Sequence, residues 1–328
     1  MRNIRWLWVL LVLAIGCVLF AVGCGSSSSS SSSDDDSQAD DDDDASPAAD
    51  DDDNDDASPD NTPPPGCDGK LVAGLNKIAV NGVVREYYLD LPSDVNEKWP
   101  WPIVFNWHGF GDTAAHMRTL INEYVNYEGF HFIEITPEDS GMILDWDIIN
   151  GTNPENREVM LFDALVAKID QCWGVDKKRI YTMGFSFGGG VSDLLGVTRG
   201  DTLAAIATCS GVYASDPANV IPYAVAKWPV LSDIANKYVE LRLHGGVLDN
   251  MVLPFGQYGV NDVIYLNQNH HDAVECLHPG THNEGFLYMS PEDFIEFLRD
   301  HPLGTTVSPY KDGFPAGYYD QCTYKPKD

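Results

Sequence analysis

Short apolar runs and longer amphipathic stretches alternate along the chain from about residue 75 onward. Two β-rich runs, 77–80 and 83–89, flank Asn81-Gly82, a dipeptide that favours a tight hairpin turn. Helical spacing predicts helices at 113–127 and 156–172, after residue 253, and from Ser290-Pro291, where serine suits the N-cap. Further apolar runs predict strands at 102–107, 130–135, 179–183, 203–208, 238–243 and 272–276.

Strands that alternate with helices are typical of a mostly parallel sheet with helices on both faces, so the predicted fold class is α/β. The antiparallel hairpin at 77–89 would form the N-terminal start of this sheet. Residues 213–237 have no clear period, and we expect them to be an insertion near the functional site.

The N-terminal segment has the pattern of an export signal. Arg2 and Arg5 precede an apolar run at 6–22, as in a secretory signal peptide covering residues 1–23. Ala21-Val22-Gly23-Cys24 resembles the lipobox of bacterial lipoproteins, with alanine in place of the usual leucine at its first position. We therefore expect Cys24 to carry a lipid that anchors the protein to the outer face of a bacterial membrane. An uncleaved signal anchor and simple secretion are the alternatives, and all three export the domain.

Residues 24–66 follow as a predicted tether. Beyond the lipidated cysteine this stretch consists almost entirely of Ser, Asp, Ala and Pro, which cannot bury enough apolar surface to order a chain. The stretch from Asp34 to Asp60 contains 15 aspartates, half of the net charge of −30. The remaining 67–328, with 35 acidic and 18 basic residues, has a net charge of −17. This balance argues against a nucleic-acid partner, and 67–328 is the predicted catalytic domain.

The predicted domain contains an odd number of cysteines. An oxidising compartment favours disulfides, but an odd count leaves at least one thiol free or paired elsewhere. Cys67 and Cys322 bracket the domain and are one pair that would join its ends, although the sequence leaves the connectivity open. The five cysteines are Cys67, Cys172, Cys209, Cys276 and Cys322.

The run Gly184-Phe185-Ser186-Phe187-Gly188 has the form G-x-S-x-G of a nucleophile elbow. An apolar strand enters it and three glycines, 188–190, lead into a helix, which is the context that such a tight turn requires. A glycine-rich turn with an incidental serine is the plainer alternative. Ser186 is therefore the predicted nucleophile. In hydrolases with this elbow, the catalytic acid follows the nucleophile in the chain, and the catalytic histidine follows the acid.

The predicted base is His282, in the loop that leaves the last predicted strand. His278 is its rival, whereas His270 and His271 are expected to end a helix, where a cationic side chain suits the helix dipole. The other histidine in this part of the chain, His244, is expected to be structural.

The predicted acid is Asp249, which follows a strand and a glycine turn at 245–246. It would fix the tautomer of the histidine and stabilise the imidazolium. Asp262 and Asp272 are alternatives, but neither directly follows a strand. The oxyanion hole requires two backbone N–H groups, and we expect those of Phe187 and Phe110, with Gly109 allowing close approach.

These residues resemble the exported esterases grouped with polyhydroxybutyrate depolymerases, feruloyl esterases and acetyl-xylan esterases. The resemblance runs from about residue 83 to 300 and implies an α/β-hydrolase fold and serine-catalysed hydrolysis of carboxylic esters without a metal or other cofactor. One departure is Thr281, where these proteins often have glycine. The matching pieces are Asn106-Trp107-His108-Gly109, 175–181, 184–189, His244-Gly245 with Asp249 and Val252, and 275–278 with His282.

The substrate is less well defined by the sequence. Trp107 and Trp146 are candidate substrate-binding residues, and Trp146 would lie against an aromatic acyl group or a sugar, or else be buried packing. The expected substrate is a polyester or an acyl ester of a plant polysaccharide. A peptidase on the same fold and a non-catalytic surface lipoprotein remain as alternative functions, and the sequence predicts no oligomeric state.

Overall fold

The structure is a computed structural model that describes residues 71–141, 145–148, 151, 155–221, 228–251 and 253–328. The predicted signal peptide, Cys24, the tether, Cys67 and Val252 lie outside the described residues. Among the residues described, no helix is both long enough and apolar enough to cross a membrane.

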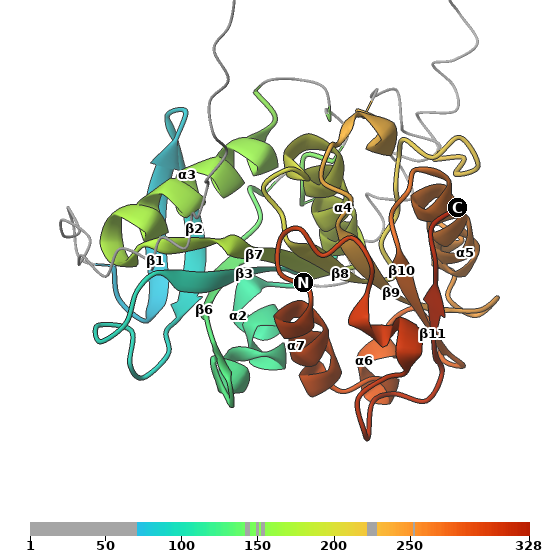
Figure 1. Cartoon of the computed structure of the whole chain (residues 1–328). Helices are drawn as coiled ribbons and strands as arrows, with labels where there is room; N and C mark the ends of the chain where they lie inside the picture. Colours follow the sequence, from blue (N-terminus) through green and yellow to red (C-terminus); the bar gives the residue numbers. More distant parts are fainter. Residues whose placement is uncertain (1–70, 142–144, 149–150, 152–154, 222–227, 252) are drawn as a thin grey trace, which may run out of the picture. The chain divides into compact units, whose positions relative to one another are not determined.

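A mixed sheet forms the centre of the described part of the chain (Figure 1). Its nine strands lie in the order β1-β2-β6-β3-β7-β8-β9-β10-β11. The six strands from β6 to β10 in this order are mutually parallel, whereas β1, β2 and β11 pair antiparallel. The strands are β1 (Gly74–Val80), β2 (Val83–Asp90), β3 (Trp101–Trp107), β6 (Ile133–Pro137), β7 (Val175–Phe185), β8 (Ala205–Cys209), β9 (Val239–Gly245), β10 (Ala273–His278) and β11 (Cys322–Lys325).

Helices cover both faces of this sheet, and each face has its own apolar core. One face carries α3 (Arg157–Trp173), α4 (Phe187–Arg199) and α5 (Phe255–Gln268), and the other carries α2 (Ala114–Met117), α6 (Gly285–Tyr288) and α7 (Pro291–Asp300) (Figure 1). Short elements complete the described chain: η1 (Arg118–Leu120), η2 (Asn122–Tyr124), β4 (Asn126–Tyr127), β5 (Phe130–His131), η3 (Leu231–Asp233) and η4 (Pro309–Asp312).

Local sequence signals explain where the long helices begin and end. The Asn156 side chain accepts from the backbone N–H groups of residues 158 and 159 and caps α3, and Gly174, at φ 70°, ends it. Ser290 and Asp293 form a reciprocal capping box at the start of α7, with Pro291 in the first turn. The predicted start of this last helix is therefore confirmed.

The predicted helix at 113–127 is wrong. Thr113 caps a helix as expected, but α2 ends at Met117 and is followed by two 3₁₀ turns and the hairpin β4-β5. The hairpin turns at Gly129, whose φ is 76°, and the N–H of Phe132 donates to the carbonyl of Val125. Burial of Ile121 and Val125 against the sheet thus decides the path of the backbone over helix propensity.

A disulfide joins Cys276 in β10 to Cys322 in β11, a strand that the sequence pattern did not predict. The suggested pairing of Cys67 with Cys322 is therefore wrong. Cys172 is also disulfide-bonded. Among the described cysteines, Cys209 is free and buried, as the odd count requires.

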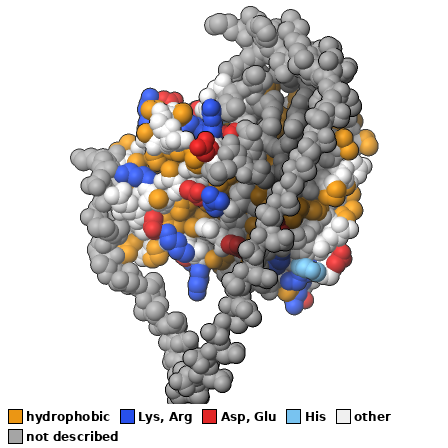
Figure 2. Space-filling view, turned by 90° about the horizontal axis from the view of Figure 1, so that it is seen from above, with side chains coloured by type: hydrophobic (Ala, Val, Ile, Leu, Met, Phe, Trp, Pro, Cys, Tyr) orange, Lys and Arg blue, Asp and Glu red, His pale blue; other side chains and the backbone are white. Residues whose placement is uncertain are grey.

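The surface of the domain mixes charges of both signs. On the visible part of the face in Figure 2, Lys and Arg side chains stand beside Asp and Glu side chains and hydrophobic groups. Ion pairs such as Arg199 with Asp163, 2.6 Å apart, join the two signs locally. The acidic net charge of 67–328 therefore coexists with paired cations on the surface.

Candidate active site

Ser186 occupies the sharp turn between β7 and α4. Its φ of 55° and ψ of −121° lie outside the regions that side-chain-bearing residues favour, as expected of a nucleophile elbow. The turn needs glycine beside it, because a Cβ on Gly188 would lie 2.2 Å from the carbonyl oxygen of Trp107. A Cβ on Gly184 would likewise lie 2.3 Å from the carbonyl oxygen of Gly188. The glycines thus let strand, turn and helix pack without a gap.

The side chains of Ser186, His282 and Asp249 form one hydrogen-bonded chain. The Nε2 atom of His282 lies 2.8 Å from Oγ of Ser186, and its Nδ1 atom lies 2.7 Å from Oδ1 of Asp249. All three residues are buried, with at most 7% of their surface exposed. The structure therefore brings the predicted nucleophile, base and acid together in the order that proton transfer from the hydroxyl requires.

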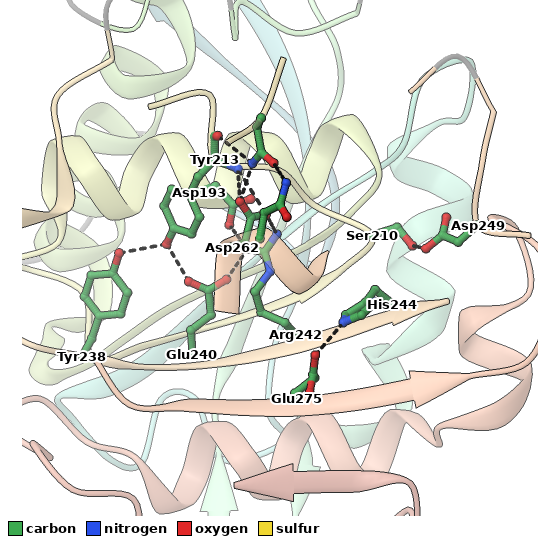
Figure 3. A network of polar contacts seen from close by, with 12 residues as sticks. Asp193, Ser210, Tyr213, Tyr238, Glu240, Arg242, His244, Asp249, Asp262 and Glu275 are labelled. Carbon is green, nitrogen blue, oxygen red and sulfur yellow. Dashed lines mark hydrogen bonds and ion pairs between the residues drawn. The ribbon is translucent and has the colours of Figure 1, made fainter. Parts of the chain in front are cut away.

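The second carboxylate oxygen of Asp249 is also held. Its Oδ2 atom accepts a hydrogen bond from Oγ of Ser210 at 2.8 Å (Figure 3). It also accepts one from the N–H of Gly245 at 2.9 Å. Burial opposes ionisation of Asp249, but the bonds from His282, Gly245 and Ser210 outweigh it and lower the pKa of the carboxyl below its ordinary value. Asp249 is therefore an ionised carboxylate at neutral pH.

The alternative residues have other roles in the structure. His278 packs on the ring of Tyr288, and neither of its ring nitrogens has a hydrogen-bond partner among the described residues. Asp272 accepts from the N–H groups of Ser308 and Lys327 and so holds the C-terminal segment.

Three histidines outside the triad are fixed by their neighbours. His244 lies with Nε2 3.2 Å from a carboxylate oxygen of Glu275 (Figure 3), which fits the structural role expected of it. His270 follows the end of α5, and its Nδ1 lies 3.1 Å from the carbonyl oxygen of Asp328. The expectation of a cationic His271 is wrong, because burial lowers its pKa to about 4.

The loop after β3 lies against the nucleophile elbow. The rings of Phe110 and Phe187 contact edge to face, with centroids 5.9 Å apart. A Cβ on Gly109 would lie 2.8 Å from the Phe185 ring, so glycine allows the approach that the sequence predicts. Within the described part of the chain, the backbone N–H groups of Phe110 and Phe187 donate no hydrogen bond. Neither N–H group is therefore engaged by another part of the described chain.

Trp107 and Trp146, the candidate substrate-binding residues, are not exposed in this structure, and Trp146 follows the alternative of buried packing. Both side chains are buried, at 0% and 1% exposure, and their rings pack edge to face 5.3 Å apart. The Nε1 of Trp107 donates to Oγ1 of Thr182, and that of Trp146 donates to the carbonyl of His108. Both are core residues whose polar atoms are already satisfied.

Among the described residues, one group of side chains has the spacing to hold a metal ion. The ligand atoms of His108, Glu138 and Asp139 lie within 4.8 Å of one another. The Nε2 of His108 lies 3.3 Å from Oε1 of Glu138, and this carboxylate outweighs the effect of burial and raises the pKa of His108. The contact between His108 and Glu138 therefore lies next to the loop that carries Phe110.

A buried ionic network around Arg242 was not expected from the sequence (Figure 3). Arg242 in β9 pairs with three carboxylates, Asp193 in α4, Glu240 in β9 and Asp262 in α5. Burial raises the pKa of Asp262 to about 7. The network ties α4, which begins beside Ser186, to its neighbouring strand and helix, and it gives Asp262 a structural role. The sequence signal was Glu240 and Arg242 inside an apolar strand.

The chain resembles known proteins in sequence and in structure. No family model matches the chain. Among curated proteins it is similar to feruloyl esterase D of Neurospora crassa, 26% identical over 142 residues, 42% of this chain and 48% of the relative. Feruloyl esterase C of Emericella nidulans is 27% identical over 151 residues, 45% of this chain and 53% of the relative. The chain thus spans about half the length of the curated relatives it matches.

Solved structures match a larger share of the chain. Native sOPH superposes with a TM-score of 0.56 at 16% identity, over 80% of this chain and 97% of that one. A ferulic acid esterase from Anaeromyces mucronatus gives 0.53 at 16% identity, over 71% and 92%. An acylaminoacyl peptidase from Pyrococcus horikoshii gives 0.52 at 13%, over 75% and 43%. At these identities the shared property is the fold, and the domain has the α/β-hydrolase fold that the sequence predicts.

Proposed function

We propose that the domain is a serine hydrolase of carboxylic esters that forms an acyl-enzyme on Ser186. The observation that carries this proposal is the buried chain of hydrogen bonds from Ser186 through His282 to Asp249. The similarity to proteins named feruloyl esterases supports ester hydrolysis as the reaction. The chain order Ser186, Asp249, His282 is the order of nucleophile, acid and base that is typical of the α/β-hydrolase fold.

The proposed mechanism follows from this geometry. Oγ of Ser186 attacks the ester carbonyl carbon while Nε2 of His282 takes the hydroxyl proton, and Asp249 stabilises the imidazolium. The backbone N–H groups of Phe110 and Phe187 stabilise the oxyanion. The alcohol then leaves with the proton from His282. A water molecule, activated by the same imidazole, releases the acid and restores Ser186.

The names of the curated relatives favour feruloyl esters as the substrates of this domain. Acetyl-xylan and hydroxybutyrate esters are the other proposed substrates. Turnover of the three ester types should be compared on the purified protein, beside peptide substrates. Peptide cleavage without ester cleavage would favour a peptidase. One of the structural neighbours is named an acylaminoacyl peptidase.

A fluorophosphonate probe separates an active serine hydrolase from an inert binding protein. We expect stoichiometric labelling of the wild-type protein and none of the Ser186→Ala variant. The matched control is Ser192→Ala, which removes a buried hydroxyl whose hydrogen bond is to Thr182. Equal labelling of the wild-type and Ser186→Ala proteins would rule out Ser186 as the nucleophile.

We also propose export, with residues 1–23 removed and Cys24 lipidated as the first residue of the mature protein. The basic start, the apolar run and the lipobox-like sequence support this. Metabolic labelling with a fatty acid should mark the processed protein, and Cys24→Ser should abolish the label and release the protein from membranes. Retention of residues 1–23 in the membrane-bound protein would instead indicate a signal anchor.

A further inference from the structure

Two consecutive residues at the end of β8 contact both the nucleophile and the acid. β8 lies between β7, which leads to Ser186, and β9, which leads to Asp249. The carbonyl of Cys209 accepts the N–H of Ser186 at 2.9 Å. The N–H of the next residue, Ser210, donates to the carbonyl of Leu243 in β9 at 2.8 Å. This corner therefore fixes the relative position of the two strand ends that carry the site.

The side chain of Ser210 points at Asp249 (Figure 3). Its Oγ lies 2.8 Å from Oδ2 of Asp249, and because an ionised carboxylate has no proton, the hydroxyl is the donor. Ser210 is 1% exposed, so water does not compete for this bond. The N–H of Gly245 donates to the same oxygen, which leaves Oδ1 directed at His282.

The backbone of Ser210 adds a second, independent observation. Its φ is 54°, in the left-handed region where glycine is at ease and a residue with a Cβ is strained. Glycine would suit the backbone better than serine does at this position. The hydroxyl is what serine supplies and glycine lacks, and its partner in the structure is Asp249.

We propose that Ser210 is a positioning residue of the active site. Its hydroxyl holds Asp249 so that Oδ1 faces Nδ1 of His282 while the imidazolium forms. Ser210 itself does not touch the reacting atoms and acts through Asp249. This inference rests on the proposed function, because it assigns a role in the reaction of Ser186.

The test uses two substitutions that both remove the hydroxyl but differ in backbone strain. Ser210→Ala keeps a Cβ at φ 54°, whereas Ser210→Gly relieves the strain. Loss of a hydrogen bond to a charged group predicts a fall in kcat/KM for ester hydrolysis of about 10- to 100-fold in both variants, mainly in kcat. Ser210→Gly also provides a folded variant if Ser210→Ala loses stability.

The pH profile gives a readout that a merely structural role would not move. His282, His278 and the thiol of Cys209 are the titratable groups around Asp249. Loss of the Ser210 donor removes one of the bonds that lower the pKa of Asp249. A more basic Asp249 carboxylate favours the protonated form of the base, so the acidic limb of kcat/KM should move to higher pH in both variants. In an Asp249→Asn background, Ser210→Ala should cause no further loss of kcat, because its partner carboxylate is gone.

The control is Ser192→Ala, which removes another fully buried hydroxyl, bonded to Thr182 at 2.9 Å. We expect it to keep wild-type kcat and an unchanged pH profile. Full activity in Ser210→Gly with a loss only in Ser210→Ala would overturn the proposal in favour of backbone strain. Unchanged activity in both variants would overturn it while leaving ester hydrolysis intact. A wild-type protein inert to esters and to fluorophosphonate would overturn the proposed function together with this inference.

Discussion

The imidazole of His282 stacks on the ring of Phe255, with centroids 4.3 Å apart and 28° between the planes. The ring of Phe185 lies against the same imidazole at 5.1 Å. Packing from these two rings and the hydrogen bonds to Ser186 and Asp249 together fix the orientation of the ring. A histidine held in this way meets the geometric demand on the proposed general base before any substrate binds.

The two histidines of the loop after β10 should therefore differ in their effect on turnover. We expect His282→Ala to lower kcat by about 10⁴-fold or more, because the base is lost. His278→Ala should stay within about 10-fold of wild type, since His278 packs on Tyr288 and has no hydrogen bond to the triad. Steady-state kinetics on one ester measures both. An inactive His278→Ala beside an active His282→Ala would reverse the assignment.

Residues that act as one unit should also be non-additive. The Ser186→Ala and His282→Ala substitutions each remove the same step, so the double variant should be no slower than the worse single variant. Residual hydrolysis above the uncatalysed rate is expected from the N–H groups of Phe110 and Phe187. If the two losses in log kcat instead add, Ser186 and His282 do not act in one proton transfer.

The order of the site residues was predictable because each follows its own strand. Ser186 follows β7, Asp249 comes four residues after β9, and His282 comes four residues after β10. Carboxyl ends of parallel strands meet at one edge of a sheet, so strand prediction brings these side chains together. Ser210 follows β8 by the same rule, but a lone serine after a strand has no motif, and its bond to Asp249 is visible only in the structure.

The rest of the structure was less accessible from the sequence because it depends on long-range contacts. Trp146 was a candidate for substrate contact, yet its N–H bonds His108 and its ring is buried. Nothing local distinguishes an exposed tryptophan after a strand from a buried one. The path of 113–127 likewise follows from burial of Ile121 and Val125 under the sheet, and local helix propensity does not predict this burial.

Two glycines of α4 should respond in opposite ways to alanine. Gly188→Ala places a Cβ 2.2 Å from the carbonyl of Trp107, and backbone atoms there cannot yield, so we expect a loss of about 3 kcal/mol or more and no activity. Gly190→Ala meets nothing closer than 3.9 Å and should gain up to about 1 kcal/mol from helix propensity. Urea unfolding checks both. A tolerated Gly188→Ala would contradict the tight elbow.

Removal of Arg242 should be among the most destabilising single changes in the domain. Arg242→Met leaves Asp193, Glu240 and Asp262 buried without their cation, and we expect a loss of about 3–5 kcal/mol. The matched control is Arg199→Met, because Arg199 pairs with Asp163 at the surface and its loss should cost at most about 1 kcal/mol. Thermal unfolding of the two variants compares them directly, and similar melting temperatures would contradict the structural role of the network.

Glu134 should make the stability of the domain depend on pH. It is fully buried in β6, its Oε1 accepts from Asn106 and Thr136, and burial raises its pKa from 4.5 to about 8. The folded protein therefore holds a proton that the unfolded chain releases above pH 4.5. This contribution is fully present below pH 4.5 and is lost as the pH rises to about 8. Glu134→Gln cannot ionise and should lose less stability across this window.

The measurement is the free energy of unfolding in urea at pH 5, 6.5 and 8 for the wild type and Glu134→Gln. The difference between the two isolates Glu134, because the other groups titrate alike in both proteins. The wild type should lose stability relative to the variant by a few kcal/mol from pH 5 to pH 8. Over this range the unfolded chain gains stability by ionising Glu134 in water, whereas the folded protein must keep the carboxyl protonated or ionise it away from solvent. The exposed Glu97→Gln is the control and should leave the curve unchanged. Parallel curves for the wild type and Glu134→Gln would mean that Glu134 is already ionised in the fold, held by Asn106 and Thr136 without a proton.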